Sequence, residues 1–360
     1  MPSVVLLRSS LHFGGVERQL LDHAQRLQGD GWDVQILALF RSAGEHPLAQ
    51  AAAAAQIPAV TIADPGPWSL SPLRQLRSRL AALSPTLIHT CDYRSDVLAY
   101  LSQRSRPQLA ESHGRTEEGR AMKLWNHIDG RVLRRLPAVV AVSTAWKTAL
   151  AAAGTPPGRL HVVGNSTAVL APPPSPPPVP LSSSGPHLLY AGRISPEKGL
   201  DVPLQAWPEI RRIYPTAQFW VLSATSPGSS YLRRIGPLLE QPGIHALGHQ
   251  PDIRPWLLAA DAVIVPSRRE AWGMTAFEAL CVGAPLLATR VGGLPDLCRN
   301  APHAHLVSPD DPTALIDGLR LLLAPDFPRG ASLGQTYRSQ PRFDPDRRHQ
   351  RLLRIYQGLS

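Results

Sequence analysis

The sequence predicts an α/β protein built from two successive doubly wound domains. Short apolar runs alternate with longer segments of helical periodicity, which is the pattern of βαβ units with parallel sheets. A proline-rich segment interrupts this alternation near the middle of the chain, and the alternation then starts again. With 360 residues, the chain has the length of two domains that each bury a core.

The first half of the chain contains the elements of an N-terminal domain, which we place at 1–168. Runs rich in β-branched residues and leucine predict strands, and leucines at helical spacing predict helices. The expected elements are strand Val4–Leu7, helix Gly15–Gln28, strand Val34–Leu39, helix Leu73–Leu83 and strands Thr86–Thr90, Val139–Val142 and Leu160–Val163. A further strand is expected to end near Ser112.

A spacer follows this domain. Ala171–Pro180 holds seven prolines in ten residues, and Leu181–Gly185 is rich in serine. Proline has no amide proton for a helix or a sheet, so the segment is expected to be polyproline-like. We interpret 169–185 as an interdomain linker; a surface loop within one domain is the alternative.

The second half repeats the alternation as a C-terminal domain, which we place at 186–338. The expected elements are strand His187–Ala191, helix Gly199–Tyr214, strand Gln218–Leu222, helix Ser230–Leu239, strand Ile244–Leu247, helix Ile253–Ala260, strand Ala262–Pro266, helix Thr275–Val282 and strand Pro285–Thr289. The remaining tail, 339–360, contains Asp344-Pro-Asp346, which is typical of a helix start. In such domains, ligands bind at the carboxyl ends of the parallel strands.

The chain is basic, with a formal net charge of +10. Residues 1–170 hold 18 basic and 12 acidic residues, a balance of +6, so the excess lies mainly in the first half. A basic protein can meet nucleic acid, an anionic membrane or a phosphorylated substrate. No nucleic-acid-binding motif is recognised, so we favour the latter two and expect no nucleic-acid partner.

Cysteine usage and hydropathy favour a cytoplasmic protein. Cys91, Cys281 and Cys298 show no metal-ligand spacing and are interpreted as reduced thiols. The apolar run Val4–Leu7 is too short for a signal-peptide core, and no run approaches the ~20 apolar residues that span a bilayer.

The most specific motif carries two glutamates, Glu270 and Glu278, within an otherwise apolar segment that ends at Pro285. Eight helical residues span about 12 Å. Between the carboxylates, Trp272, Gly273, Met274 and Thr275 open a helix whose free amides can receive an anion. This layout fits a ligand with two hydroxyl-rich ends joined by a diphosphate, as in a nucleotide sugar. The alternative is a solvated pair of glutamates on a helix surface.

A second motif is the loop Gly192-Arg193…Lys198-Gly199, which directly follows the strand His187–Ala191. Gly192 permits a sharp turn, and Gly199 is expected to open the next helix. Two cations five positions apart on a strand-to-helix loop can clamp a diphosphate and stabilise the charge that grows on a leaving group. Solvent-exposed basic side chains are the alternative.

Two weaker signals lie in the N-terminal domain. Gly14-Gly15 follows the first strand and opens a helix, which allows a ligand to approach the backbone closely. His113 follows the strand that ends near Ser112, where it is expected to face a sugar; a structural histidine is the alternative. His12 and His89 have similar places with less support.

Together these residues resemble the GT-B glycosyltransferases, specifically the retaining enzymes of the GT4 family (glycosyl transferases group 1). The resemblance covers Gly14-Gly15, His113-Gly114, Gly192-Arg193 with Lys198-Gly199, Gly248 and Glu270 with Glu278. It implies two Rossmann-like domains that face a cleft, with a C-terminal helix crossing back to the acceptor-side N-terminal domain. Asn165-Ser166 departs from the Asn-Gly usual in that family, and the proline-rich linker is also unusual.

The resemblance implies roles for individual residues. Arg193 and Lys198 would hold the donor diphosphate, Glu278 the ribose and Glu270 the transferred sugar. His113 would contact the sugar, Gly15 would lie against the diphosphate, and Gly248, His249 and Gln250 would meet the base. The implied reaction retains anomeric configuration and uses no metal; we expect no cofactor, with the nucleotide sugar as donor substrate.

Three other functions remain open from the sequence. They are a nucleotide-sugar epimerase on the same architecture, a donor-binding protein that has lost catalysis, and a nucleic-acid binder suggested by charge alone. The acceptor is not specified by any motif. However, Arg74, Arg77 and Arg79 lie on the expected helix Leu73–Leu83, with Trp68 upstream. A basic helix face favours peripheral contact with an anionic membrane and a lipid-linked acceptor in cell-envelope glycan synthesis. The alternative is an ordinary crossover helix.

Overall fold

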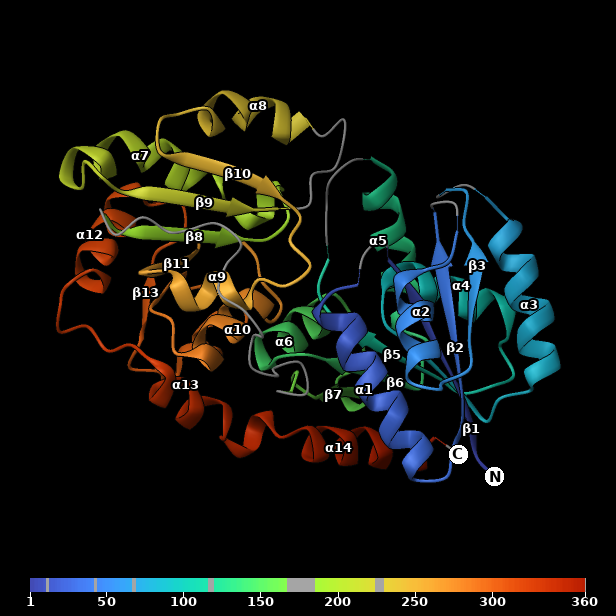
Figure 1. The fold of residues 1–360 in the computed structure, drawn as a ribbon. Helices are drawn as coiled ribbons and strands as arrows, with labels where there is room; N and C mark the ends of the chain where they lie inside the picture. Colours follow the sequence, from blue (N-terminus) through green and yellow to red (C-terminus); the bar gives the residue numbers. More distant parts are fainter. Residues whose placement is uncertain are drawn as a thin grey trace. The chain divides into compact units, whose positions relative to one another are not determined.

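The chain folds into two compact α/β units (Figure 1). The structure is a computed structural model that describes residues 1–10, 13–41, 44–66, 69–115, 120–166, 185–223 and 230–359. One unit comprises Met1–Val169 and Pro341–Ser360, and the other comprises Leu170–Gln340. The expected linker 169–185, except Gly185, lies outside the described residues, as do His12 and Trp68.

The first unit is built on a seven-stranded parallel sheet in the order β3-β2-β1-β4-β5-β6-β7. Its strands are β1 Ser3–Ser9, β2 Asp33–Phe40, β3 Ala59–Ala63, β4 Leu87–Thr90, β5 Gln108–Ser112, β6 Ala138–Ala141 and β7 Leu160–Val162. The chain winds outward from β1 to β3 and then returns to β4 on the other side of β1. The strand order therefore reverses between β1 and β4, which is the switch point where such sheets bind ligands.

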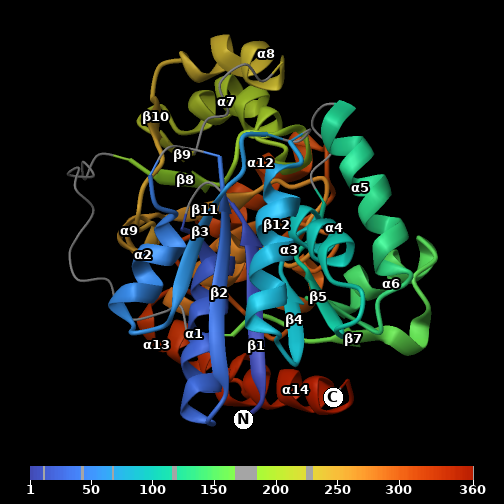
Figure 2. The same ribbon diagram turned by 90° about the vertical axis from the view of Figure 1, so that its right-hand side faces the viewer.

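Helices cover both faces of this sheet (Figure 2). Alternate strand residues point to opposite faces: Val4 and Leu6 pack with α1, α2 and α14, whereas Val5 and Leu7 pack with α3 and α4. A third cluster joins α4, α5 and α6 to β5 and β6. The helices are α1 Gly15–Gly29, α2 Pro47–Ala54, α3 Ser71–Leu83, α4 Tyr93–Ser102, α5 Arg120–Leu133, α6 Thr144–Ala152 and α14 Pro345–Gln357.

The last helix, α14, belongs to the first unit although it ends the chain. Asp344 caps its N-terminus by accepting hydrogen bonds from the amides of Asp346 and Arg347, as the Asp-Pro-Asp sequence predicts. Leu352 and Tyr356 are fully buried in the core cluster that contains α1 and the sheet. The helix is thus held by burial of its apolar face.

The second unit has a six-stranded parallel sheet in the order β10-β9-β8-β11-β12-β13. Its strands are β8 His187–Ala191, β9 Gln218–Leu222, β10 Ile244–Gly248, β11 Ala262–Val265, β12 Leu286–Thr289 and β13 Ala304–Val307. The order reverses between β8 and β11. Both units therefore have the doubly wound architecture that the sequence predicts.

The second sheet is also covered on both faces. One face packs against α7, α8 and α12, with Trp207 and Phe219 in the core, and the other packs against α9 and α10. The helices are α7 Asp201–Ile213, α8 Ser230–Leu239, α9 Arg254–Ala259, α10 Met274–Val282, α11 Leu294–Cys298, α12 Pro312–Leu322 and α13 Ala331–Arg338; short 3-10 helices lie at Pro157–Arg159, Pro196–Lys198 and Pro341–Phe343.

One expected helix start is wrong. Gly199 does not open the helix but ends the 3-10 helix Pro196–Lys198 in a left-handed conformation, with φ of +67°, and α7 begins at Asp201. A Cβ at Gly199 would also collide with the carbonyl oxygen of Pro266. Glycine is needed here because the chain must turn tightly against the loop that follows β11.

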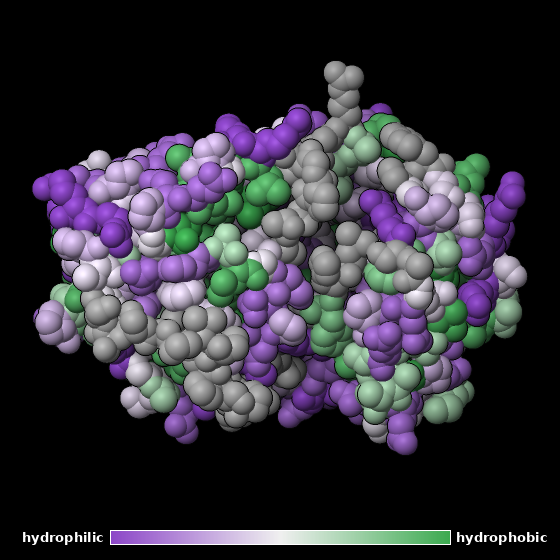
Figure 3. Space-filling model, turned by 45° about the horizontal axis from the view of Figure 1, so that its top comes forward, coloured by the Kyte–Doolittle hydropathy of each residue, from purple (hydrophilic) through white to green (hydrophobic). Residues whose placement is uncertain are grey.

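No helix in the described part of the chain is both long and apolar enough to cross a membrane. On the face that Figure 3 shows, outside the residues drawn in grey, hydrophobic residues form patches that are separated by hydrophilic ones.

Candidate active site

The predicted donor residues of the second unit gather where its strand order reverses. Lys198 follows β8 and Glu270 follows β11, so the two side chains come from the two strands that flank the switch point. The Nζ atom of Lys198 lies 2.5 Å from Oε2 of Glu270, and Ser267 Oγ lies 3.3 Å from the same oxygen. Both charged side chains are largely buried, at 22% and 12% exposure. A cation and an anion thus stand together at the ligand-binding end of the sheet.

Arg193 lies at the start of the same loop. The Tyr190 hydroxyl donates to its carbonyl oxygen at 2.7 Å, and its guanidinium lies 3.4 Å from Glu197 Oε1. The Arg193 side chain is 53% exposed, whereas Glu197 is buried. The backbone of the loop is therefore fixed while a positive charge remains accessible to solvent or to a ligand.

A buried cluster ties this loop to the loop after β11. The Arg268 guanidinium donates to both carboxylate oxygens of Asp201, at 2.8 and 2.9 Å, and to the carbonyl oxygen of Pro196 at 2.7 Å. The Tyr231 hydroxyl donates to Asp201 at 2.5 Å. Burial alone would raise the pKa of Asp201, but Arg268 and Tyr231 lower it below its usual range. The sequence did not indicate this cluster, which joins the segment before Lys198 to the segment before Glu270.

Glu278 is buried in α10, at 5% exposure. The helix begins after Gly273, whose φ of +101° favours glycine and whose Cβ would collide with Leu294. Thr275 donates to the carbonyl oxygen of Ala191 at 2.8 Å, which joins the start of α10 to the end of β8. Trp272 packs edge-on against Phe277. Trp272, Met274 and Thr275, all partly buried, thus form the predicted helix N-terminus near the switch point.

The predicted base-contacting residues follow β10. Gly248 accepts from the amide of Ser223 at 2.8 Å, His249 is exposed, and the Gln250 side chain donates to the carbonyl oxygen of Leu247 at 3.1 Å. Arg254, at the start of α9, has a raised pKa because of Asp252, with a smaller contribution from Glu278. Helices α9 and α10, which carry Arg254 and Glu278, pack against each other.

In the first unit, Gly14 and Gly15 form the turn into α1 beside its own switch point. Glu17 accepts from the Gly14 amide at 2.9 Å and from Arg8 Nε at 2.7 Å. Burial would raise the pKa of Glu17, but Arg8 and these hydrogen bonds lower it to about 2. The ionised carboxylate of Glu17 therefore fixes the turn at Gly14. No motif in the sequence indicated this role of Glu17.

His113 lies directly after β5, as predicted, with its side chain 13% exposed. Its Nε2 atom is 3.4 Å from Oε1 of Glu111, and Trp146 donates to the preceding Ser112 hydroxyl at 2.9 Å. Burial lowers the pKa of His113 to about 4, so the imidazole is neutral at physiological pH. A neutral imidazole can donate or accept a hydrogen bond at a sugar hydroxyl.

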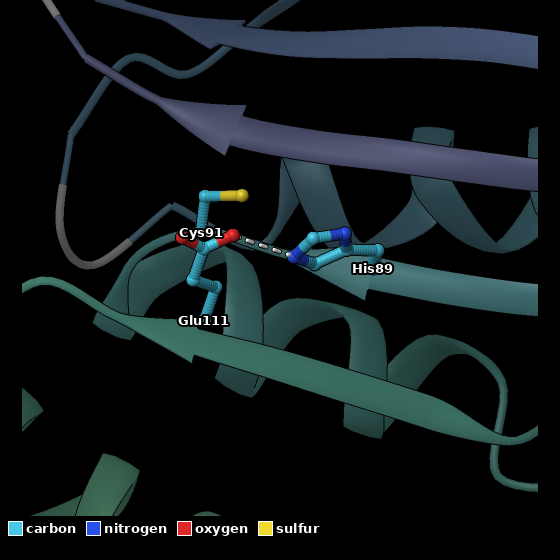
Figure 4. A group of neighbouring side chains, drawn as sticks. All are labelled: His89, Cys91 and Glu111. Atoms are coloured by element: carbon cyan, nitrogen blue, oxygen red, sulfur yellow. Dashed lines mark ion pairs between the residues drawn. The ribbon is translucent and has the colours of Figure 1, made fainter. Parts of the chain in front are cut away.

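His89, Cys91 and Glu111 form a buried group whose donor atoms all lie within 4.8 Å of one another (Figure 4). The spacing would suit a metal ion, but Glu111 and the Nδ1 atom of His89 already have protein partners. Arg348 donates to Glu111 at 2.5 Å, and His89 Nδ1 lies 2.6 Å from the Tyr356 hydroxyl. Burial and Glu111 raise the pKa of the Cys91 thiol. We therefore interpret the group as a polar network.

Ser166, which stands where the family usually has glycine, is hydrogen-bonded to Gln19. The Gln19 side chain on α1 donates to the Ser166 carbonyl oxygen at 2.6 Å and accepts from its hydroxyl at 2.9 Å. The side chain that replaces the family's usual glycine is thus bonded into the first unit.

Comparison with known families accounts for both units. The model described as Glycosyltransferase Family 4 matches residues 13–169, and the model described as Glycosyl transferases group 1 matches 185–325. The chain belongs to the GT-B glycosyltransferases. The two matches cover most of both units, and together with the solved structures below they confirm the predicted family and fold class.

Relatives of this glycosyltransferase match part of its length. D-inositol 3-phosphate glycosyltransferase from Xylanimonas cellulosilytica is 33% identical over 49% of this chain and 43% of its own. Lipopolysaccharide 1,2-N-acetylglucosaminetransferase from Salmonella typhimurium is 32% identical over 38% of this chain and 39% of its own. The chain thus matches less than half the length of these curated relatives.

Solved structures extend the likeness to the whole fold. Anabaena HepE in complex with UDP and glucose has a TM-score of 0.78 at 19% identity, covering 100% of both chains. Sucrose-phosphate synthase from Thermosynechococcus elongatus has a TM-score of 0.78 at 20% identity, covering 100% of this chain and 99% of the other. At these identities the likeness establishes the GT-B fold.

Proposed function

We propose that this glycosyltransferase moves a hexose from a nucleotide-sugar donor to an acceptor with retention of anomeric configuration and without a metal. The observation that carries the proposal is the Lys198–Glu270 pair at the switch point of the second sheet, 2.5 Å apart. A lysine at this edge can bind a diphosphate, and the neighbouring carboxylate can accept hydrogen bonds from a sugar. The family matches and the UDP-glucose complexes of the fold relative support this reading.

Each predicted residue then has a part in the reaction. Lys198 and Arg193 stabilise the diphosphate as negative charge grows on the leaving group. Glu278 accepts from the ribose hydroxyls, Glu270 orients the transferred sugar, and neutral His113 hydrogen-bonds to that sugar. The leaving phosphate itself takes the acceptor proton, which suits a site where the cations surround the leaving group.

The test is a donor panel of UDP-, GDP- and ADP-glucose, each incubated with D-inositol 3-phosphate, with lipopolysaccharide core or without acceptor. We expect release of nucleoside diphosphate from one donor, faster with one acceptor than without. An isomerised sugar with no nucleoside diphosphate released would favour the epimerase. Donor binding with no turnover across the panel would favour a binding protein that has lost catalysis.

We further propose that the acceptor is lipid-linked or part of a cell-envelope glycan, and that α3 rests on an anionic membrane at the cytoplasmic side. Leu76 and Leu80 face the core, whereas Arg74, Arg77 and Arg79 are exposed. Three exposed leucines lie at the ends of α3 or on the adjacent α4: Leu70 at 66%, Leu83 at 40% and Leu101 at 40% exposure, the last with its carbonyl bonded to Arg77. Cations beside exposed apolar side chains suit a membrane surface.

The triple change Arg74, Arg77 and Arg79→Ser should therefore weaken binding to anionic liposomes. At about 1 kcal/mol per cation, the expected loss is roughly a hundredfold at low salt. The control changes three exposed arginines of α14, Arg347, Arg351 and Arg354, to serine, because α14 covers the opposite face of the sheet. Co-sedimentation measures both variants. Equal recovery of the wild type with neutral and anionic liposomes would leave a soluble acceptor as the better proposal.

A further inference from the structure

A continuous polar network lies buried within the first unit and connects His113 to the last helix of the chain. Glu111 is at its centre, 2% exposed at the carboxyl end of β5. Its two carboxylate oxygens face three groups: Arg348 on α14 at 2.5 Å, His89 at 3.2 Å and His113 at 3.4 Å. The contact between Glu111 and Arg348 joins residues 237 positions apart in the chain.

The network continues from Glu111 and His89 to Tyr356, near the C-terminal end of α14. The Tyr356 hydroxyl lies 2.6 Å from His89 Nδ1 and 3.0 Å from His23 Nε2. His349, also on α14, lies 3.0 Å from His23 and reaches Asp30 at 2.8 Å. Three side chains of α14 thus enter a buried polar network that touches α1, β4 and β5. Apolar packing alone would not require them.

The groups around Glu111 keep its carboxylate ionised next to the imidazole of His113. Burial would raise the pKa of Glu111, but Arg348, His113 and His89 lower it well below its usual range, so the carboxylate stays ionised. An ionised carboxylate oxygen 3.4 Å from Nε2 of His113 favours the tautomer that carries its proton on that nitrogen. In that tautomer the Nδ1 atom is an acceptor, which suits a sugar hydroxyl.

We propose that Glu111 and Arg348 are positioning residues that hold the imidazole of His113 in one tautomer and orientation, so that sugar transfer requires α14 to be docked on the first unit. This inference rests on the proposed function of His113 as a sugar contact. In this proposal α14 also contributes to the site, because Arg348 is the cation that keeps Glu111 charged and in place.

The test compares Arg348→Met, Glu111→Gln and the double variant that carries both changes. Arg348→Met leaves a buried carboxylate unpaired and is expected to destabilise the fold, whereas the double variant removes both charges together. Arg351→Met is the matched control, because Arg351 is exposed on the same helix. Nucleoside diphosphate binding should remain unchanged in the double variant, since the predicted diphosphate cations, Arg193 and Lys198, belong to the second unit.

We expect the double variant to melt near the wild-type temperature while its kcat falls by about tenfold or more with little change in donor KM. The second readout is the titration of His113 by NMR, near pH 4 in the wild type. Four charged groups act on this imidazole: Glu111 and Glu17 raise its pKa, and Arg8 and Arg348 lower it. Arg348→Met should therefore raise the His113 pKa, and Glu111→Gln should lower it further.

Wild-type kcat in a folded double variant would overturn the proposal, as would a His113 titration that neither single variant changes. If the wild type transferred no sugar at all, the proposed function would fail first. The NMR titration would still decide whether Glu111 and Arg348 control His113, because it needs no donor and no acceptor.

Discussion

Lys198→Ala is expected to lower turnover by roughly 10²-fold or more, and Arg193→Ala by a similar factor. Each change removes a positive charge from the loop after β8, where charge develops on the leaving diphosphate. The fold should tolerate both changes, because Arg193 is 53% exposed and Lys198 forms an ion pair only with Glu270 among the described residues. Steady-state kinetics with the preferred donor measure the effect.

The controls for this prediction are Lys123→Ala and Arg212→Ala, which change exposed side chains away from the predicted site. Both should keep wild-type kinetics and thermal stability. Near-wild-type turnover in both Lys198→Ala and Arg193→Ala would remove the loop 193–199 from the reaction.

The two glutamates are expected to separate in calorimetry with free nucleoside diphosphate. Glu278→Ala should weaken binding about tenfold to a hundredfold, because a hydrogen bond to a charged group contributes roughly 1.5–3 kcal/mol. Glu270→Ala should leave diphosphate affinity nearly unchanged and lower kcat, since its predicted partner is the transferred sugar. Glu240→Ala, an exposed residue of the same unit, serves as the control.

One calorimetric result would contradict the roles given to Glu270 and Glu278. If Glu270→Ala abolished diphosphate binding and Glu278→Ala did not, the roles would be exchanged. Glu270→Ala could also weaken diphosphate binding indirectly, by displacing Lys198 from its position. Glu270→Gln tests this cause, because it keeps a hydrogen-bond acceptor near Lys198 Nζ.

The sequence predicted the strands and donor loops because their signals are local. The run Val4–Leu7 and the glycine-bounded loop after β8 carry their patterns in neighbouring residues. Strands β3, Ala59–Ala63, and β13, Ala304–Val307, were missed because their burial is slight and their sequences are short. The turn at Gly199 was misjudged because its conformation depends on Pro266, which is distant in sequence.

The supporting contacts could not be predicted in this way. Arg268 and Asp201 lie 67 positions apart, and Arg348 and Glu111 lie 237 apart. Each residue alone is an ordinary charged side chain in sequence, and only the packing of distant elements makes it a buried partner. The residues predicted to touch a ligand are marked by local motifs, whereas the residues that support them become visible only in the fold.

The stoichiometry of transfer tests most directly whether this protein moves a sugar from a nucleotide-sugar donor to an acceptor. Wild-type protein is incubated with the donor selected by the panel, labelled in its sugar, and both nucleoside diphosphate and labelled acceptor are counted. We predict that the two products appear in equal amounts, that chelation of metals leaves the rate unchanged, and that Lys198→Ala suppresses both products together. Label that stays on the nucleotide as a different sugar, or turnover that survives in Lys198→Ala, would contradict this prediction.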